Sequence, residues 1–168
     1  SVWDEFFSQS KIISESEKVY KTVFEEKLGD EAVTDYSAGE KSANTTVRLM
    51  QGFFRNTILN IYDTKCCITG ISIPELLVAS HIVPWKKDKN NRLNPRNGIC
   101  LNALHDKAFD KGFITISDKY EIIVSRKIEN ISENTLITDS DRRKISLPDR
   151  FLPAREFLEY HRTHIFRG

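Results

Sequence analysis

The sequence contains no apolar run that approaches the roughly 20 residues needed to cross a bilayer. Its first residues, SVWDEFFSQS, also lack the basic patch and apolar core of a secretory signal. The chain begins without methionine, and we therefore expect it to be a C-terminal fragment of a longer protein. These absences argue against the membrane and secreted classes. They lead us to expect a cytoplasmic protein with no membrane partner.

Cysteine is also scarce, with Cys66, Cys67 and Cys100 as the three examples. An odd count with two adjacent residues is a poor disulfide framework. We therefore expect reduced, packed thiols, as in a cytosolic protein. Structural zinc sites usually combine four ligands from paired knuckles, and no C-x-x-C occurs in this sequence. The sequence thus disfavours structural zinc.

Internal repeats and low-complexity segments are absent as well. The 168 residues are 39% hydrophobic and 29% charged, which is typical of a globular protein of ordinary composition. A chain of this length can form one domain with a substantial core. We predict a single α+β domain over residues 1–168. Its parts are an N-terminal helical segment over 1–63, a core over about 64–125 and a C-terminal helix over 153–166.

Helical periodicity predicts two helices before the core. Apolar residues between Lys11 and Leu28 recur at the spacing of one helix face. Residues 29–43 are polar and contain two glycines, which predicts a linker or exposed loop. Asn44-Thr45-Thr46 can then cap a second helix, which we expect to end near Tyr62. The apolar positions of that helix are Val47, Met50, Phe54, Ile58 and Ile61.

The predicted core consists of short strands and one short helix. Cys66–Gly70 predicts a strand that enters a turn. Glu75–Val83 predicts a second strand, which Pro84 ends because proline cannot donate to a ladder. Ile99–Leu101 predicts a short returning strand. The remaining elements are a helix over Ala103–Asp110, capped by Asn102, and a β-hairpin formed by residues 113–116 and 120–125.

The net charge of +1 conceals an uneven distribution. Residues 1–40 hold four Lys against ten Asp and Glu, a balance of −6, whereas residues 41–168 hold 21 Lys and Arg against 14 Asp and Glu, a balance of +7. A basic loop lies within residues 81–96 and suits a phosphate backbone. Basic loops are also common as merely solvated segments. The candidate nucleic-acid contacts in this loop are Arg96, Arg92, Lys86 and Lys87.

Three polar residues on the expected strand, loop and helix can carry chemistry. His81 follows an apolar run, Asn97 closes the basic loop and His105 lies in the short helix. Phosphodiester hydrolysis requires an activated water, stabilised negative charge and a fixed phosphate. Histidine suits proton transfer because its unperturbed pKa is near neutrality, and it is also a common metal ligand. Asparagine both donates and accepts hydrogen bonds, so it can anchor a loop.

Each of these residues also has a purely structural interpretation. A histidine after an apolar run, such as His81, is often a satisfied core residue. Asn97-Gly98 is a common turn pair. His105 is spaced by four residues from Leu101 and from Phe109, so it is expected on the packed face of its helix and could belong to the core. The three residue types together, in this order on strand, loop and helix, favour a functional site.

A long set of residues around these three matches a known pattern. The matching residues are Thr69-Gly70, Ala79–Trp85, Asn94–Gly98, Leu101, Leu104–Asp106 and Phe109–Gly112. On these residues the segment Cys67–Ile116 resembles an HNH endonuclease, and more narrowly the HNH branch found in restriction endonucleases. The flanking segments Gln51–Arg55 and Pro153–Phe166 also look like the corresponding parts of those proteins.

The resemblance implies a ββα-metal (HNH) core with flanking helices and an extra β-hairpin. It also implies a divalent cation, most often Mg²⁺ although Mn²⁺ also fits, and DNA as the partner. By the same resemblance, His81 is the general base, Asn97 anchors the loop and His105 is a metal ligand. Ser80 stands where many HNH enzymes have an Asp or His ligand. Asp106 and Asp110 are therefore candidates to support the metal site, and Ser80 is a weaker one.

The resemblance further implies a metal-dependent DNA endonuclease of restriction or defence type, leaving 5′-phosphate and 3′-hydroxyl ends. One such site cuts one strand, so cleavage of a duplex would need a homodimer or two encounters. The alternative is a non-catalytic nucleic-acid-binding module on a degenerate HNH scaffold, which Ser80 motivates. A nuclease toxin with a cognate inhibitor is a third interpretation, for which the sequence shows no specific feature.

Overall fold

The computed structural model describes residues 36–129 and 135–168. The chain divides into two compact units, Ser1–Ala43 and Asn44–Gly168, and all predicted site residues lie in the second. The helix predicted over Lys11–Leu28 lies outside the described residues, and the single domain over residues 1–168 stays a prediction. No helix in the described part of the chain has the length and apolarity required to cross a membrane.

Helix α2 (Tyr36–Ile61) begins earlier than the sequence predicts. The linker expected over residues 29–43 is wrong from Tyr36 onward, and Asn44-Thr45-Thr46 lies inside the helix rather than at its cap. The segment contains no proline and includes Ala, Glu and Lys, which favour helix even without apolar partners. The end at Ile61 agrees with the prediction.

Strands β1 (Leu77–His81) and β2 (Gly98–Asn102) form a two-stranded antiparallel sheet. His81 pairs with Gly98 at the end of the ladder. The 3-10 turns η1 (Pro74–Leu76) and η2 (Pro95–Asn97) lead into the two strands. The sheet therefore joins the two ends of the basic loop, with His81 at one end and Asn97 at the other.

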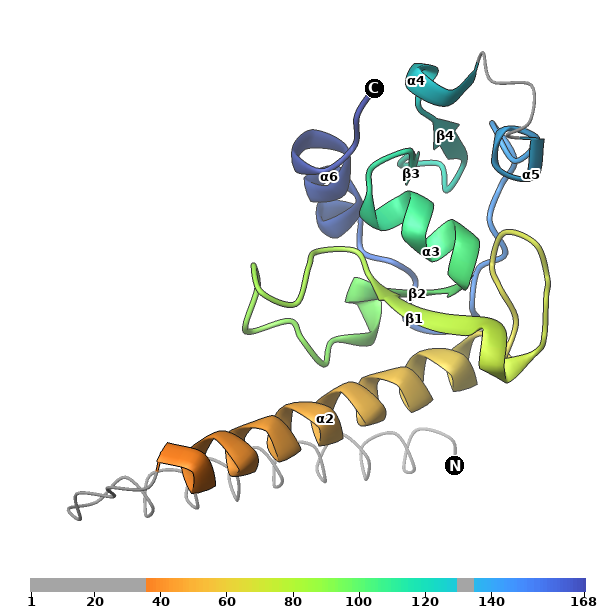
Figure 1. Cartoon of the computed structure of the whole chain (residues 1–168). Helices are drawn as coiled ribbons and strands as arrows, with labels where there is room; N and C mark the ends of the chain where they lie inside the picture. The colour runs from red at the N-terminus through yellow and green to blue at the C-terminus, as the bar shows by residue number, and fades with distance from the viewer. Residues whose placement is uncertain (1–35, 130–134) are drawn as a thin grey trace. The chain divides into compact units, whose positions relative to one another are not determined.

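Helix α3 (Ala103–Asp110) has the predicted bounds and the predicted cap. The Asn102 side-chain oxygen accepts from the backbone N–H of His105 at 3.0 Å. Figure 1 shows α3 on one side of the β1–β2 sheet and the C-terminal part of α2 on the other. This strand–strand–helix arrangement places the helix residues next to the end of β1.

Of the strand entering a turn predicted over Cys66–Gly70, the turn is present and the strand is wrong. The N–H of Gly70 donates to the carbonyl of Cys66 at 2.9 Å, and Gly70 has a φ of +74°, a conformation that glycine adopts without steric cost. Cys67 still reaches the sheet, since its N–H donates to the carbonyl of Cys100 at 2.8 Å. All three cysteines are free and buried.

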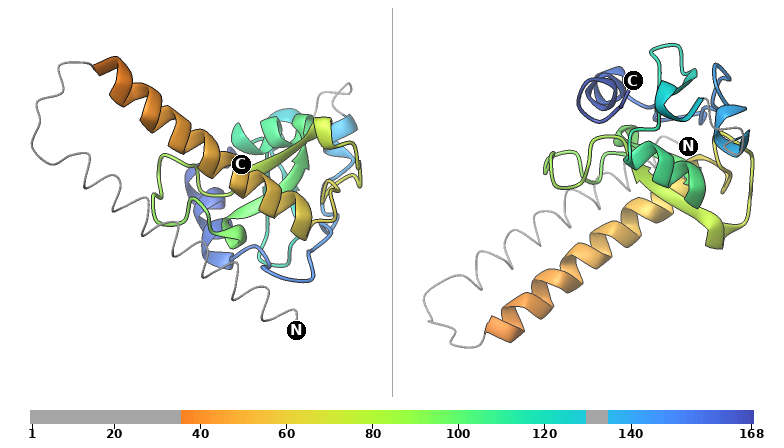
Figure 2. Two further views of the ribbon diagram at one scale, coloured as in Figure 1. Left: turned by 90° about the horizontal axis from the view of Figure 1, so that it is seen from below. Right: turned by 45° about the horizontal axis from the view of Figure 1, so that its top comes forward.

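Strands β3 (Ile114–Ile116) and β4 (Ile122–Val124) form the predicted hairpin. Helix α6 (Arg155–His164) occupies the segment predicted as the C-terminal helix. The short helices α4 (Arg126–Glu129) and α5 (Thr135–Thr138) lie between the predicted hairpin and the predicted C-terminal helix, where the sequence analysis expects no helix. Figures 1 and 2 place α5 and α6 on opposite sides of α3. The α+β class with flanking helices and an extra hairpin is confirmed.

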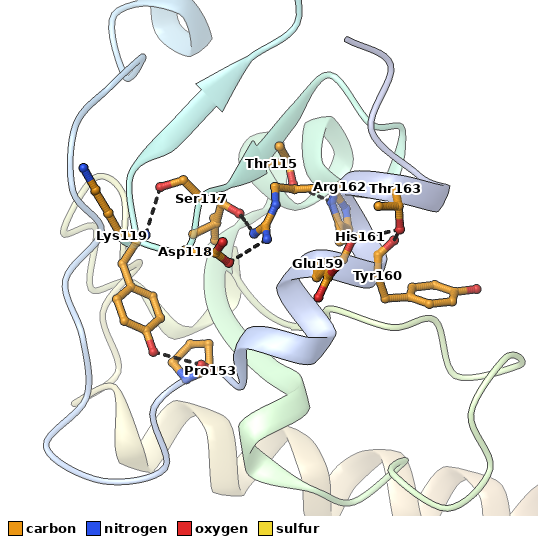
Figure 3. Close-up of polar contacts among 12 residues, drawn as sticks. Thr115, Ser117, Asp118, Lys119, Pro153, Glu159, Tyr160, His161, Arg162 and Thr163 are labelled. Carbon is orange, nitrogen blue, oxygen red and sulfur yellow. Dashed lines mark hydrogen bonds and ion pairs between the residues drawn. The ribbon is translucent and has the colours of Figure 1, made fainter.

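Buried polar contacts hold α6 against the hairpin and α3 (Figure 3). The Thr115 hydroxyl donates to His161 Nδ1 at 2.8 Å, and His161 Nε2–H donates to the Phe109 carbonyl at 3.1 Å. The imidazole also stacks on the Phe109 ring, with centroids 3.7 Å apart. Burial lowers the pKa of His161 to about 4, so the ring is neutral at pH 7. Arg162 adds an ion pair with Asp118 at 2.6 Å.

A hydrophobic core connects α2, the sheet, α3, the hairpin and α6. Its fully buried side chains include Phe54, Ile58, Ile99, Phe109 and Leu158. Burying a side chain of this size contributes about 1.5–3 kcal/mol relative to leaving it exposed. The core therefore fixes the relative positions of β1 and α3, which carry the site.

Candidate active site

His81 is half-buried at the end of β1, with one ring nitrogen fixed by backbone. Its Nε2–H donates to the carbonyl of Arg92 at 2.8 Å, and this bond leaves Nδ1 as the acceptor nitrogen. The ring stacks on Phe54 with centroids 3.7 Å apart and meets the edge of Trp85 at 5.4 Å. Burial lowers the pKa of His81, an effect that the Arg92 carbonyl and Asp110 oppose. The imidazole is therefore neutral near pH 7 and able to accept a proton.

Asn97 is buried and bonds to both sides of the basic loop. Its side-chain oxygen accepts from the N–H of Val83 at 2.8 Å, and its amide group donates to the carbonyls of Val83 and Asn91 at 3.3 and 3.2 Å. Its backbone carbonyl accepts from the N–H of Ile82. Asn97 thus satisfies backbone groups next to His81, as expected of a loop anchor.

Gly98 allows α2 to approach the end of the ladder. A Cβ atom at this position would lie 2.5 Å from Ile58 Cδ1 and 2.6 Å from Phe54 Cζ. Because Phe54 stacks on the imidazole, the absence of a side chain at residue 98 helps to define the position of His81.

His105, the predicted metal ligand, points into the protein core. It is 2% exposed, and its Nδ1–H donates to the side-chain oxygen of Asn102 at 3.1 Å. Its Nε2 is buried without a hydrogen-bond partner among the described residues, and the backbone of Leu136 lies near the ring. Burial lowers the pKa of His105. The structure therefore gives His105 the environment of the core interpretation.

Asp106 and Asp110 lie one turn apart on α3 and face the end of β1. Burial raises the pKa of the Asp106 carboxyl, and the charge of Asp110 adds to this effect, whereas the nearby Ser80 hydroxyl opposes it. Asp110 also acts electrostatically on His81. The Asp106 carboxyl thus lies near Ser80, and the charge of Asp110 acts both on Asp106 and on the candidate base His81.

The carboxyl groups of Asp106 and Asp110, together called the acidic group, have the chemistry to bind a divalent cation. Ser80 Oγ is buried and has no hydrogen-bond partner within ordinary distance among the described residues. The two carboxylates repel each other, and a bound cation would relieve that repulsion. No cluster of three or more His, Cys, Asp or Glu suited to a metal occurs in the described residues. The acidic group would therefore supply two carboxylates, with Ser80 as a weak third ligand.

The four basic candidates of the loop have different environments. Arg92 donates through Nε to the carbonyl of Trp85 at 2.9 Å, and its guanidinium carbon lies 4.8 Å from the Trp85 ring centroid. Arg96 is exposed, with a long 3.4 Å bond from Nε to the carbonyl of Leu152. Lys86 and Lys87 are also exposed. Arg96 and the two lysines are thus free to reach a phosphate, whereas Arg92 is engaged within the loop.

Phe54 and Trp85 lie beside His81, although the sequence analysis assigned neither of them to the site. Both line a pocket of about 220 Å³ beside His81. The pocket is lined by Gln51, Phe54, Arg55, Val78, Ala79, His81 and Trp85. Arg55 fixes one wall by donating to the carbonyls of Leu77 and Pro74 at 2.6 and 2.8 Å. The helical spacing of Phe54 predicts a core position and gives no signal of its contact with the imidazole.

A strand–strand–helix unit with a histidine, a loop-anchoring asparagine and an acidic group has the form of an HNH nuclease site. Residues 66–117 match the model of the family HNH_2, described as HNH endonuclease. The resemblance inferred from the sequence is thereby confirmed for this segment, and the match agrees with the predicted enzyme class, an HNH-type endonuclease.

Comparison with whole proteins is more limited. No curated protein matches the chain. A solved structure, "Modification dependent TagI restriction endonuclease", is similar with a TM-score of 0.49 and 15% sequence identity. The similarity covers 67% of this chain and 37% of that one.

Proposed function

We propose that the chain cleaves DNA as a metal-dependent endonuclease of restriction or defence type. The observation that carries the proposal is the His81 imidazole at the end of β1, with Nδ1 left as acceptor and the charge of Asp110 acting on the ring. The restriction type is supported by the matching residues of the sequence pattern, and DNA is the substrate class expected of an HNH endonuclease. A cytoplasmic location stays a prediction.

In this proposal His81 is the general base. Its Nδ1 takes the proton of the attacking water, and the Nε2–H bond to the Arg92 carbonyl fixes the required tautomer. The imidazolium that forms is stabilised by Asp110, whose charge raises the pKa of His81. Attack on phosphorus with departure of the 3′ oxygen leaves 5′-phosphate and 3′-hydroxyl ends.

We assign the cation to Asp106 and Asp110, with Ser80 beside them, rather than to His105. Carboxylate oxygens suit Mg²⁺, the expected cation, and Mn²⁺. When bound, such a cation stabilises negative charge on the phosphate and the departing oxygen. The burial of His105 and its bond to Asn102 support this change from the ligand that the sequence resemblance implies.

The basic loop would orient the substrate. Arg96, Lys86 and Lys87 are exposed and could contact phosphate oxygens, which fix position without reading sequence. Asn97 keeps the loop closed through its three bonds to Val83 and Asn91. One site cuts one strand, so duplex cleavage would use a homodimer or successive encounters.

A plasmid assay tests the proposal directly. Supercoiled DNA incubated with the protein and Mg²⁺ or Mn²⁺ should be converted to the nicked form, and DNA ligase alone should reseal the nicks, because it requires 5′-phosphate and 3′-hydroxyl ends. Salt-sensitive DNA binding without nicking under any metal would instead favour the non-catalytic module. Nicks that ligase cannot reseal would contradict the proposed products.

A further inference from the structure

The loop between β1 and β2 touches the imidazole of His81 at two points. The carbonyl of Arg92 accepts from Nε2 at 2.8 Å, and the edge of Trp85 meets the ring at an interplanar angle of 84°. These two loop residues are joined to each other, because Arg92 Nε donates to the Trp85 carbonyl and the guanidinium covers the indole. His81, Trp85 and Arg92 therefore form a closed set of contacts.

The Arg92 side chain provides the link between Arg92 and Trp85 in this set. Its Nε bond and its position over the indole, with Cζ 4.8 Å from the centroid, link residues seven positions apart in the loop. Within residues 36–129 and 135–168, both of its side-chain attachments are to Trp85 and neither is to an acidic side chain. The backbone carbonyl that holds the imidazole belongs to the same residue, so a shift of the side chain would also shift that carbonyl.

The rest of the loop is held by short polar contacts. The Asp88 carboxylate accepts from the N–H groups of Asn90 and Asn91 and from the Asn91 amide, at 2.7–3.2 Å. The Asn91 side-chain oxygen accepts from Asn94 at 2.8 Å, and the Asn91 carbonyl accepts from Asn97. Neighbouring carbonyls of one segment thus bind Asn97 and His81. Such a loop can transmit the position of Arg92 to the imidazole.

We propose that Arg92 and Trp85 are positioning residues, a clamp that holds the His81 ring in the Nε2–H tautomer with Nδ1 toward the substrate. The inference rests on the proposed role of His81 as general base. It gives Arg92 a different function from the phosphate contact that its charge and sequence position suggest. Lys89, exposed in the same loop, provides a matched control for the loss of one positive charge.

Kinetics separate the two functions of Arg92. Arg92→Ala should lower kcat for plasmid nicking about tenfold or more, because general-base catalysis depends on the tautomer and alignment of the base, and should leave KM within about twofold. Arg92→Lys keeps the charge but lacks the Nε–H that bonds Trp85, so kcat should remain low. Lys89→Ala should retain kcat. Full activity in Arg92→Lys, or an Arg92→Ala effect confined to KM, would overturn the clamp.

A spectroscopic measurement tests the clamp without any activity. In ¹⁵N-histidine-labelled protein, with the His81 signal assigned from its loss in His81→Ala, the wild type should show a protonated Nε2 and an unprotonated Nδ1. Arg92→Ala and Trp85→Ala should show mixed tautomers at the same pH, while thermal melts establish that they are folded. An unchanged tautomer in both folded variants would overturn the inference. If the wild type proves inactive on DNA, the proposed function fails while this measurement still decides the clamp.

Discussion

His105 and Asp106 are adjacent in α3 but lie in opposite environments. The imidazole of His105 is 2% exposed and bonds to Asn102, whereas the Asp106 carboxyl lies beside Ser80 and is influenced by Asp110. Adjacent positions in a helix point about 100° apart. His105 therefore belongs to the core, and Asp106 is the residue that we propose for the site.

Metal binding should depend on the aspartates of α3 and not on the buried His105. Asp106→Asn and Asp110→Asn should each weaken Mn²⁺ binding at least about tenfold, because each removes a carboxylate ligand. His105→Gln should lower the thermal midpoint but retain the metal affinity of the wild type. Calorimetric titration with Mn²⁺, run below the melting temperature of every variant, measures both. Loss of Mn²⁺ binding in folded His105→Gln with retention in the Asp variants would restore the original assignment.

Replacing Asn97 should destabilise the fold as well as the site. Asn97→Ala leaves the buried N–H of Val83 without its acceptor, which costs about 1–3 kcal/mol. Urea unfolding followed by circular dichroism gives the change in free energy of unfolding. Asn97→Asp keeps an acceptor for Val83 but loses the donor to Asn91, so its loss should be of the same order. A stability equal to that of the wild type in both variants would contradict the anchoring role.

Gly98→Ala should impair nicking through Phe54. The new Cβ would lie 2.6 Å from the ring that stacks on His81 and 2.5 Å from Ile58, and both neighbours are buried. Overpacking of this kind costs about 1–3 kcal/mol. Gly52→Ala is the matched control, because nothing lies within 4 Å of a Cβ there, and it should stabilise α2 by roughly 0.5–1 kcal/mol. If Gly98→Ala proved more stable than Gly52→Ala, the close approach of α2 to Gly98 would be contradicted.

The buried His161 should make stability depend on pH. Its pKa falls from 6.5 to about 4 on folding because of burial, so between these values the unfolded chain binds a proton that the folded chain does not. The stabilisation of the fold by neutral His161 is therefore complete above pH 6.5. As the pH falls towards 4, the free energy of unfolding decreases by a total of about 3 kcal/mol. Thermal melts between pH 4.5 and 7.5 should show this slope, and His161→Gln should flatten it. An equal slope in wild type and variant would contradict the assignment.

Much of the site-bearing fold follows from local signals in the sequence. Asn102 and Gly112 bracket α3, and its observed bounds agree with the prediction. The spacing of Leu101, His105 and Phe109 already indicates a packed face, and the structure buries all three. The metal role of His105 came from the family resemblance alone. The helical periodicity indicated the burial of His105, and its role as a metal ligand stays a prediction.

Other features depend on tertiary contacts that a local pattern does not contain. The turn at Cys66–Gly70 has a strand-like composition, but it ends in a glycine with positive φ and bonds to itself. The contact of Trp85 with His81 forms only when the loop closes, as does the bond of Arg92 to Trp85. A basic residue in a loop predicts a phosphate contact by its charge, and only the folded loop reveals its attachments.

The central claim, that His81 is the general base, is tested most directly by His81→Ala in single-turnover plasmid nicking with Mg²⁺ and Mn²⁺. Loss of a general base should slow cleavage by about 10²–10⁴-fold, while thermal melting and DNA binding remain close to the wild type. His164→Ala is the control, because His164 is exposed on α6 and should leave the rate unchanged. Nicking by folded His81→Ala at the wild-type rate would contradict the account.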